Sequence, residues 1–165
     1  MTEHALRPLL EPRSIAVVGA SAREGTLGHT SVQQAIIGGL DGPIYPINPR
    51  YDSILETDCY ASYAELPSPA ELAVLAVGNE RIEEQLCLAL EHGAKAAVIF
   101  TSAYLENDEP PLLLERLRSI AREAGIPVCG ANCLGLAQFE VGARATWFGH
   151  GQLEAGPISM ISHSG

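Results

Sequence analysis

The chain has 165 residues, 47% of them hydrophobic, and a formal net charge of −10. This length supports one substantial hydrophobic core rather than two full-sized domains, and the acidic balance argues against a nucleic-acid partner, because binding that backbone requires a basic face. No apolar run reaches the roughly eighteen residues of a membrane span, and no signal-peptide segment opens the chain, so we expect a cytoplasmic protein without a membrane partner.

A glycine-rich loop follows the first predicted strand, at residues 14–18. The loop, residues 19–28, leads into a helical pattern over residues 29–37 and contains Arg23. Glycine lets the backbone turn sharply and approach a ligand, and a helix N-terminus offers unpaired N–H groups to an anion. The three glycines of this loop do not have the G-x-G-x-x-G spacing of ordinary dinucleotide enzymes. The loop therefore predicts a nucleotide-like, phosphate-bearing ligand.

The rest of the chain alternates strand and helix. Residues 72–77 form a continuous apolar run, which is typical of a strand buried on both faces of a parallel sheet. Asn79 can cap the helix that follows, and proline stands in the first turn of the later helix. The other predicted strands are 44–47, 96–100 and 126–129, and the two helices are 80–92 and 110–124. This order predicts an α/β fold, a Rossmann-like doubly wound parallel sheet in three αβα layers.

The residues after the second strand distinguish between ligands. In such sheets the ligand binds outside the carboxyl ends of the strands, and NAD enzymes usually carry Asp or Glu after the second one. Here the sequence is Asn48-Pro49-Arg50. A cation suits a ribose that bears a phosphate, either the 2′-phosphate of NADP or the 3′-phosphate of coenzyme A. An Asn-Pro turn without a binding role is the structural alternative.

Five segments in order, over nearly the whole chain, resemble one family. They are residues 15–21 (IAVVGAS), 43–50 (PIYPINPR), 72–77 (LAVLAV), 130–135 (GANCLG) and 161–165 (ISHSG). Together they resemble the N-terminal CoA-binding domain of the NDP-forming acyl-CoA synthetases. That superfamily includes the ADP-forming acetate–CoA ligases and the α subunit of succinyl-CoA synthetase.

The resemblance implies a path for coenzyme A along these loops. Residues 19–28 would hold the phosphates, with Ser21 and Thr26 as hydroxyl contacts, and residues 48–50 would lie near the adenosine and its 3′-phosphate. Val77 and Gly78 would flank the adenine or ribose, and four later residues would line the pantetheine arm. The candidate CoA-binding residues are Gly19, Ala20, Ser21, Arg23, Gly25, Thr26, Leu27, Gly28, Asn48, Pro49, Arg50, Val77, Gly78, Thr101, Ser102, Tyr104 and Asn132. No catalytic residue and no metal ligand is predicted in the chain.

Several positions depart from the family pattern. Gly78 and Ala131 stand where the family usually has proline, Ala103-Tyr104 where it has glycine-phenylalanine, and His163 where it has glutamine or arginine. His163 is not expected to be the phosphohistidine of the family, which lies further downstream in a second domain. Residues 162–165 instead resemble the start of a helix whose N-terminus receives that phosphate.

The resemblance divides the chain at residue 150. Residues 1–150 would form the CoA-binding domain, and residues 151–165, with a strand at 157–161, a linker and the first strand of a flavodoxin-like ligase domain. The family reaction makes acyl-CoA from a carboxylate, CoA and a nucleoside triphosphate by way of acyl phosphate and phosphohistidine. The phosphohistidine and ATP-grasp domains, and with them NTP and Mg²⁺, would belong elsewhere in the same or a partner chain. We therefore expect this chain to bind CoA without turning over alone.

Two other functions remain open from the sequence. A stand-alone CoA-binding or sensory module fits the length of the chain. An NADP-dependent oxidoreductase would use the same loop and Arg50, but no substrate domain follows, and the sole lysine, Lys95, is not placed as a partner for Tyr104. The carboxylic acid, the choice between ADP and GDP, and the formation of a homo-oligomer through apolar surface near residues 157–161 are also left open.

Overall fold

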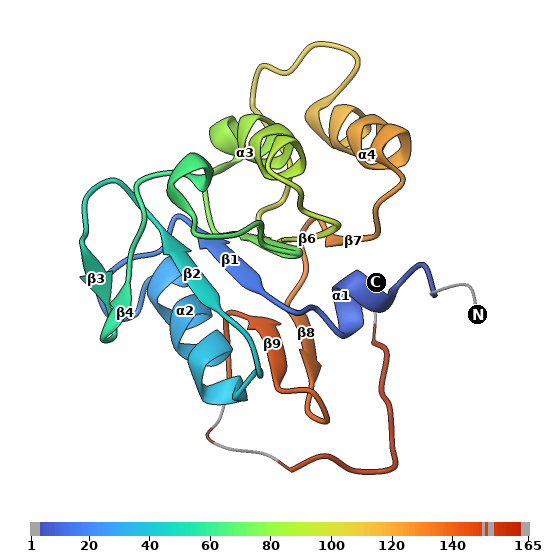
Figure 1. The fold of residues 1–165 in the computed structure, drawn as a ribbon. Helices are drawn as coiled ribbons and strands as arrows, with labels where there is room; N and C mark the ends of the chain where they lie inside the picture. The colour runs from blue at the N-terminus through green and yellow to red at the C-terminus, as the bar shows by residue number, and fades with distance from the viewer. Residues whose placement is uncertain (1–3, 150, 152–153, 163–165) are drawn as a thin grey trace.

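The centre of the molecule is a five-stranded parallel sheet (Figure 1). The computed structural model describes residues 4–149, 151 and 154–162. The strand order is β2-β1-β5-β6-β7. The strands are β1 (Ile15–Val18), β2 (Ile44–Ile47), β5 (Leu72–Leu75), β6 (Ala96–Ile99) and β7 (Val128–Gly130). Because β1 lies between β2 and β5, the chain reverses direction across the sheet there, and the predicted doubly wound parallel sheet is confirmed.

Helices cover both faces of the sheet. Helices α3 (Asn79–Glu91) and α4 (Leu113–Ala124) lie on one face, and α2 (Leu27–Gly38) lies on the other (Figure 1). Alternate residues of β1 enter two cores, since Val18 packs in the cluster that contains Ile82 of α3, and Val17 in the cluster that contains Val32 of α2. The three predicted layers are therefore present. No helix in the described ranges has the length and apolar character that crossing a membrane requires.

Two helices begin at positions that differ from the prediction. Helix α2 begins at Leu27 rather than residue 29, because the Thr26 hydroxyl caps it by accepting the N–H of His29 at 3.3 Å. Helix α4 begins at Leu113 rather than residue 110. A residue that precedes proline is disfavoured in the helical region, which applies to Glu109 and Pro110, and the Asp108 carboxylate accepts the N–H of Leu113 at the helix start. The sequence shows which residues suit a helix start, but the tertiary contacts select the one that is used.

Several short elements were not predicted. They are α1 (Arg7–Leu10), the 3₁₀-helix η1 (Tyr63–Glu65), the hairpin β3 (Ser53–Ile54) and β4 (Thr57–Asp58), and the hairpin β8 (Gly135–Gln138) and β9 (Ala143–Thr146). Each has at most four residues, too few to leave a clear pattern in the sequence. The β8–β9 hairpin adds Leu136 and Ala145 to the core on the α2 side of the sheet.

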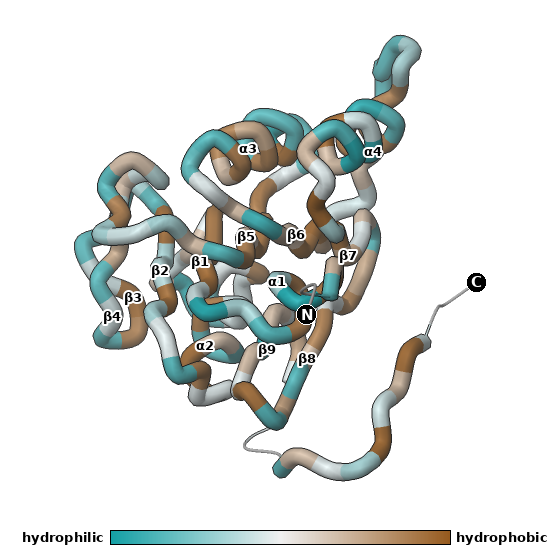
Figure 2. Tube along the Cα trace, turned by 45° about the vertical axis from the view of Figure 1, so that its right-hand side comes forward, coloured by the Kyte–Doolittle hydropathy of each residue, from teal (hydrophilic) through white to brown (hydrophobic). Residues whose placement is uncertain are grey.

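The strand predicted at residues 157–161, as the first strand of a second domain, is not formed among the described residues. Described residues 154–162 contain no strand, and they run away from the body of the molecule (Figure 2). Ile158 and Met160 are each 86% exposed and Ile161 fully so, which agrees with the apolar surface expected there. A strand needs a neighbour to accept and donate its backbone hydrogen bonds, and no described strand pairs with this segment. His163 and the rest of the predicted helix start at 163–165 lie outside the described residues.

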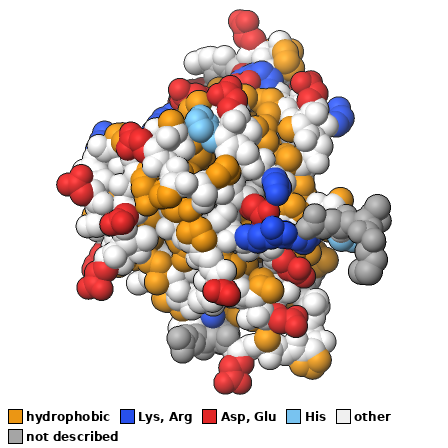
Figure 3. All heavy atoms as spheres, in the orientation of Figure 1, with side chains coloured by type: hydrophobic (Ala, Val, Ile, Leu, Met, Phe, Trp, Pro, Cys, Tyr) orange, Lys and Arg blue, Asp and Glu red, His pale blue; other side chains and the backbone are white. Residues whose placement is uncertain are grey.

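Glu71 joins three segments at the amino ends of the strands. Its carboxylate accepts the Arg13 N–H at 2.9 Å and forms ion pairs with Lys95 at 3.0 Å and with Arg7 of α1 at 3.3 Å. Figure 3 shows acidic and basic side chains together beside α1. Burial opposes ionisation of this group, but the Arg13 N–H and the Lys95 ammonium outweigh that effect and hold the pKa of Glu71 below its usual value. The interaction ties α1 and β6 to the start of β5.

We predict that Glu71→Gln lowers the free energy of unfolding at pH 7 by about 1 to 3 kcal/mol, because the buried acceptor loses its charge. A group with a lowered pKa in the folded state stabilises the fold above its unfolded pKa, so the difference from wild type should shrink as the pH falls below about 4. Urea denaturation at several pH values measures it. Glu123→Gln, at an exposed position of α4, is the control, and an equal effect of the two changes would contradict the prediction.

Candidate ligand-binding site

A cleft opens at the carboxyl ends of β1, β2 and β5. Its volume is about 540 Å³, and it lies where the strand order reverses, the position at which open α/β sheets bind their ligands. The walls come from the loops after the three strands, from η1 with the residues around it, and from one face of α3. Six predicted residues line it: Gly19, Asn48, Pro49, Arg50, Val77 and Gly78.

Close backbone contacts fix the glycine loop in place. Gly19 has a φ of +82°, and a Cβ there would stand 2.4 Å from the carbonyl oxygen of Ala76. At Gly28 a Cβ would stand 2.0 Å from the carbonyl oxygen of Gly19. These two glycines let the first turn of α2 and the end of β5 pack directly on the end of β1. The N-terminus of α2 is therefore held at the binding edge of the sheet.

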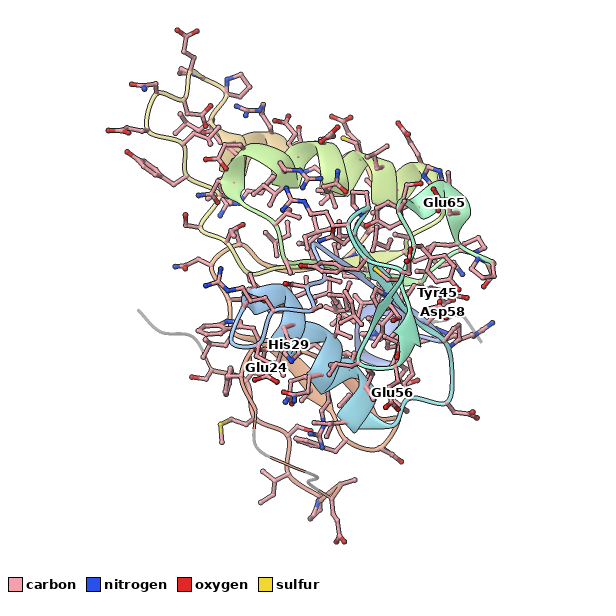
Figure 4. All side chains as sticks on the ribbon, turned by 90° about the vertical axis from the view of Figure 1, so that its left-hand side faces the viewer. Glu24, His29, Tyr45, Glu56, Asp58 and Glu65 are labelled. Carbon is pink, nitrogen blue, oxygen red and sulfur yellow. The ribbon has the colours of Figure 1, made fainter. Side chains whose placement is uncertain are left out.

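The loop hydroxyls are tied into the loop itself. The Ser21 hydroxyl accepts the N–H of Arg23 at 3.0 Å, and the Thr26 hydroxyl donates to the carbonyl oxygen of Arg23 at 2.7 Å. The buried His29, which the sequence did not single out, has its Nδ1 3.2 Å from the Ser21 carbonyl oxygen (Figure 4). Ala20 is buried, Leu27 is half-buried, and Arg23 and Gly25 are exposed. The structure thus shows a shaping role for the hydroxyls of Ser21 and Thr26, and their contacts with phosphate stay a prediction.

Asn48 connects the loops that follow β1 and β2. Its Nδ2 donates to the carbonyl oxygen of Ala20 at 2.7 Å, and its Oδ1 accepts the N–H of Arg50 at 3.0 Å. The second bond is the local turn that the sequence offered as the structural alternative. The same turn leaves Arg50 exposed at the wall of the cleft, so the turn and a binding role are compatible.

The remaining predicted residues lie along the carboxyl ends of β6 and β7. The N–H of Asn132 donates to the carbonyl oxygen of Thr101 at 2.8 Å, which joins the two loops. The Thr101 hydroxyl is buried and has no hydrogen-bond partner among the described residues. Ser102 is exposed, and Tyr104 is 66% exposed. These four residues are not among those that line the cleft, so the predicted site has two parts on one edge of the sheet.

The predicted cap of α3 by Asn79 is wrong. Gly78 is the N-cap residue, and Asn79 is the first residue of the helix. Its side chain instead donates to the Ser102 hydroxyl at 3.2 Å and accepts the N–H of Ala103 at 3.0 Å. Ala103 has a φ of 55°, a conformation that alanine rarely adopts, and this hydrogen bond holds it there. Asn79 therefore links the cleft to the loop after β6.

Two cysteines adjoin the loop after β7. The Cys133 thiol lies 3.3 Å from the Ile99 carbonyl oxygen and 3.6 Å from that of Cys129. The nearby Cys129 side chain lowers the pKa of Cys133 to about 7, and the Cys133 side chain, together with burial, raises the pKa of Cys129. Among the described residues, no cluster of histidine, cysteine and carboxylate side chains is placed to hold a metal ion.

One face of α3 contributes residues that the sequence analysis missed. Arg81, Gln85, Leu88 and His92 line the cleft and recur at helical spacing, a signal that was available in the sequence. Tyr63 of η1 lies on the same wall, and its ring stacks on His92 with centroids 5.9 Å apart and an angle of 19°. Burial raises the pKa of the Tyr63 hydroxyl, and this hydroxyl has no partner in the described part of the chain.

Comparisons with known proteins agree in sequence and in fold. A family model described as "CoA binding domain" matches residues 13–138. Acetate–CoA ligase (ADP-forming) II of Archaeoglobus fulgidus is 34% identical over 97% of this chain and 24% of its own length. The α subunit of acetate–CoA ligase (ADP-forming) I of Pyrococcus furiosus is 31% identical over 98% of this chain and 36% of its own length.

A solved structure shows the same fold. It is the acetyl-coenzyme A synthetase 1 of Ca. Korarchaeum cryptofilum in complex with phosphate and ADP, and it matches with a TM-score of 0.78 and 30% identity. The match covers 86% of this chain and 30% of that one. The chain thus spans only about a quarter to a third of the proteins that it matches.

We predict that Gly28→Ala costs about 1 to 3 kcal/mol of stability, because the new Cβ would overlap the backbone of Gly19. Gly25→Ala is the matched change: Gly25 has a φ of +74° with no atom within 4 Å of a Cβ, so only the conformational cost of about 1 kcal/mol applies. Urea denaturation of the two variants measures both costs. A larger loss at Gly25 than at Gly28 would contradict the packing described for the loop.

Proposed function

The chain belongs to the CoA binding domain family, and on that premise we propose that it supplies the coenzyme A site of an NDP-forming acyl-CoA synthetase. Its sequence and fold match the CoA-binding domain of the ADP-forming members. The observation that carries the proposal is Arg50 on the wall of the cleft, after the second strand, where NAD enzymes place a carboxylate. A guanidinium there favours a ribose phosphate.

The adenosine half of CoA would occupy the cleft. Its adenine or ribose would lie against Val77 and Gly78, and its 3′-phosphate would meet Arg50. The pyrophosphate would lie against the glycine loop and the N-terminus of α2, where backbone N–H groups and the helix dipole favour an anion. The absence of acidic side chains among the described residues that line the cleft supports this placement.

The pantetheine arm would run from the cleft along the ends of β6 and β7. Thr101, Ser102, Tyr104 and Asn132 would line it. The buried Thr101 hydroxyl without a partner supports this path, because an amide of pantetheine would satisfy it. Asn79 joins the two parts of the site through Ser102 and Ala103, so the adenosine and the arm would be held by one connected framework.

The role of these residues in the reaction would be to bind CoA and present its thiol. Acyl phosphate and phosphohistidine chemistry would take place in other domains, in the same or a partner chain, and those domains would also hold NTP and Mg²⁺. The designation of one relative as an α subunit supports a partner chain. We place the domain within residues 1–150 and a linker to a second domain within residues 151–165. A cytoplasmic location follows from coenzyme A as the ligand.

Calorimetric titration with CoA, dephospho-CoA and NADP tests the ligand. We predict that CoA binds and that removal of its 3′-phosphate weakens binding by about 1.5 to 3 kcal/mol, the range for hydrogen bonds to charged groups. Arg50→Gln should reduce this difference and leave the affinity for dephospho-CoA nearly unchanged. A preference for NADP would make the protein an oxidoreductase, and no binding of CoA would contradict the proposed function.

A second prediction concerns turnover. The purified chain with acetate, CoA, ATP and Mg²⁺ should form no thioester above background, because its residues are proposed only to bind and orient CoA. Chromatographic detection of acetyl-CoA provides the measurement, with a full-length ADP-forming relative as the positive control. Thioester formed by the chain alone would overturn the division of roles.

A further inference from the structure

The cleft has a second arginine that faces it from the other side of β1. Arg50 follows β2, whereas Arg81 lies in the first turn of α3, after β5, and both line the cleft. Since β2 and β5 flank β1, the two strand ends stand about 9.5 Å apart, two strand spacings. Both arginines line the same cleft, so two long side chains can approach one anion that is held in it.

Neither guanidinium is engaged by the described residues. Over the described ranges, the side chains of Arg50 and Arg81 have no hydrogen bond and no ion pair, and both residues are exposed. Arg116 shows the opposite arrangement, because Glu83 and Asp108 bind it between α3 and α4. Arg116 therefore stabilises the fold, whereas the two arginines of the cleft remain available for an external anion.

The charges around the cleft favour such an anion. The chain has 20 acidic residues against 10 basic ones, yet none of the described residues that line the cleft is acidic. Glu56 and Asp58 of the β3–β4 hairpin and Glu65 of η1 are labelled in Figure 4 and do not line the cleft, although the Glu65 carboxylate accepts the N–H of the lining residue Ala61 at 3.3 Å. A locally positive cleft on an acidic protein concentrates an anionic ligand where it binds.

The number of cations points to one phosphate of the ligand. A phosphate monoester carries a charge of about −1.5 to −2 at pH 7, which one guanidinium neutralises only in part. Helices α3 and α2 cover opposite faces of the sheet (Figure 1), so Arg81 and the N-terminus of α2, where the pyrophosphate is placed, belong to opposite faces. The monoester of CoA is its 3′-phosphate.

We propose that Arg81 is a second specificity-determining residue, which binds the 3′-phosphate of coenzyme A together with Arg50. This inference rests on the proposed function. It adds a role for α3 in selecting the ligand. It also makes discrimination between CoA and dephospho-CoA a joint property of the two arginines.

Calorimetry of the whole chain with CoA and with dephospho-CoA tests the inference. Arg81→Gln should weaken the binding of CoA about tenfold, or 1.4 kcal/mol, and the binding of dephospho-CoA less than about twofold. Arg81→Lys, which keeps the charge, should restore most of the loss. Arg118→Gln, at an exposed position of α4 outside the cleft, should change neither affinity. In a chain that already carries Arg50→Gln, Arg81→Gln should weaken CoA binding less than it does in the wild type, because both residues bind one group.

The outcomes separate this inference from the proposed function. If the wild type binds CoA and Arg81→Gln weakens the binding of CoA and dephospho-CoA equally, the assignment of Arg81 fails and the CoA site stands. The same holds if Arg81→Gln changes the binding of neither ligand. If wild type binds no CoA, the proposed function fails and the inference fails with it. Thermal melting of each variant verifies that the fold is intact, which the exposure of Arg81 leads us to expect.

Discussion

The contact of three backbone segments at the end of β1 is the constraint on which the rest of the structure depends. Gly19 packs on the carbonyl oxygen of Ala76, and Gly28 packs on that of Gly19, with no side chain between them. These contacts bring the loops after β1 and β5 and the start of α2 to one point, and Asn48 adds the loop after β2. The cleft is the space that these segments enclose. Any side chain at either glycine would move its walls apart.

Charge is arranged differently at the two ends of the same strands. At the amino ends, Glu71 gathers the side chains of Arg7 and Lys95 and the backbone N–H of Arg13 into a partly buried cluster that stabilises the fold. At the carboxyl ends, arginines line a cleft that has no acidic residue among the described residues of its lining. An acidic protein can thus hold an anionic cofactor, because its cations are paired where stability is needed and unpaired where the ligand enters.

The helices and strands of the central fold, and the part of the site that lines the cleft, could be predicted from the sequence. Buried parallel strands are continuous apolar runs such as residues 72–77, and the turn at Asn48 depends on its own side chain, so both are visible locally. The role of Asn79 was misjudged because its partner is distant in the chain: its side chain binds the loop after β6. No described strand pairs with residues 157–161, so the second domain predicted there stays a prediction. Arg81 and His92 were missed because α3 was read for its buried stripe alone, although the face next to that stripe lines the cleft.

A crystal structure of the chain with coenzyme A tests the central claim most directly. The account predicts adenosine in the cleft between Asn48 and Val77, the pyrophosphate at the start of α2, and the pantetheine arm along Thr101 and Asn132 toward the end of β7. Coenzyme A bound at the amino ends of the strands, near Glu71, or across the β8–β9 hairpin would contradict it, whatever its affinity.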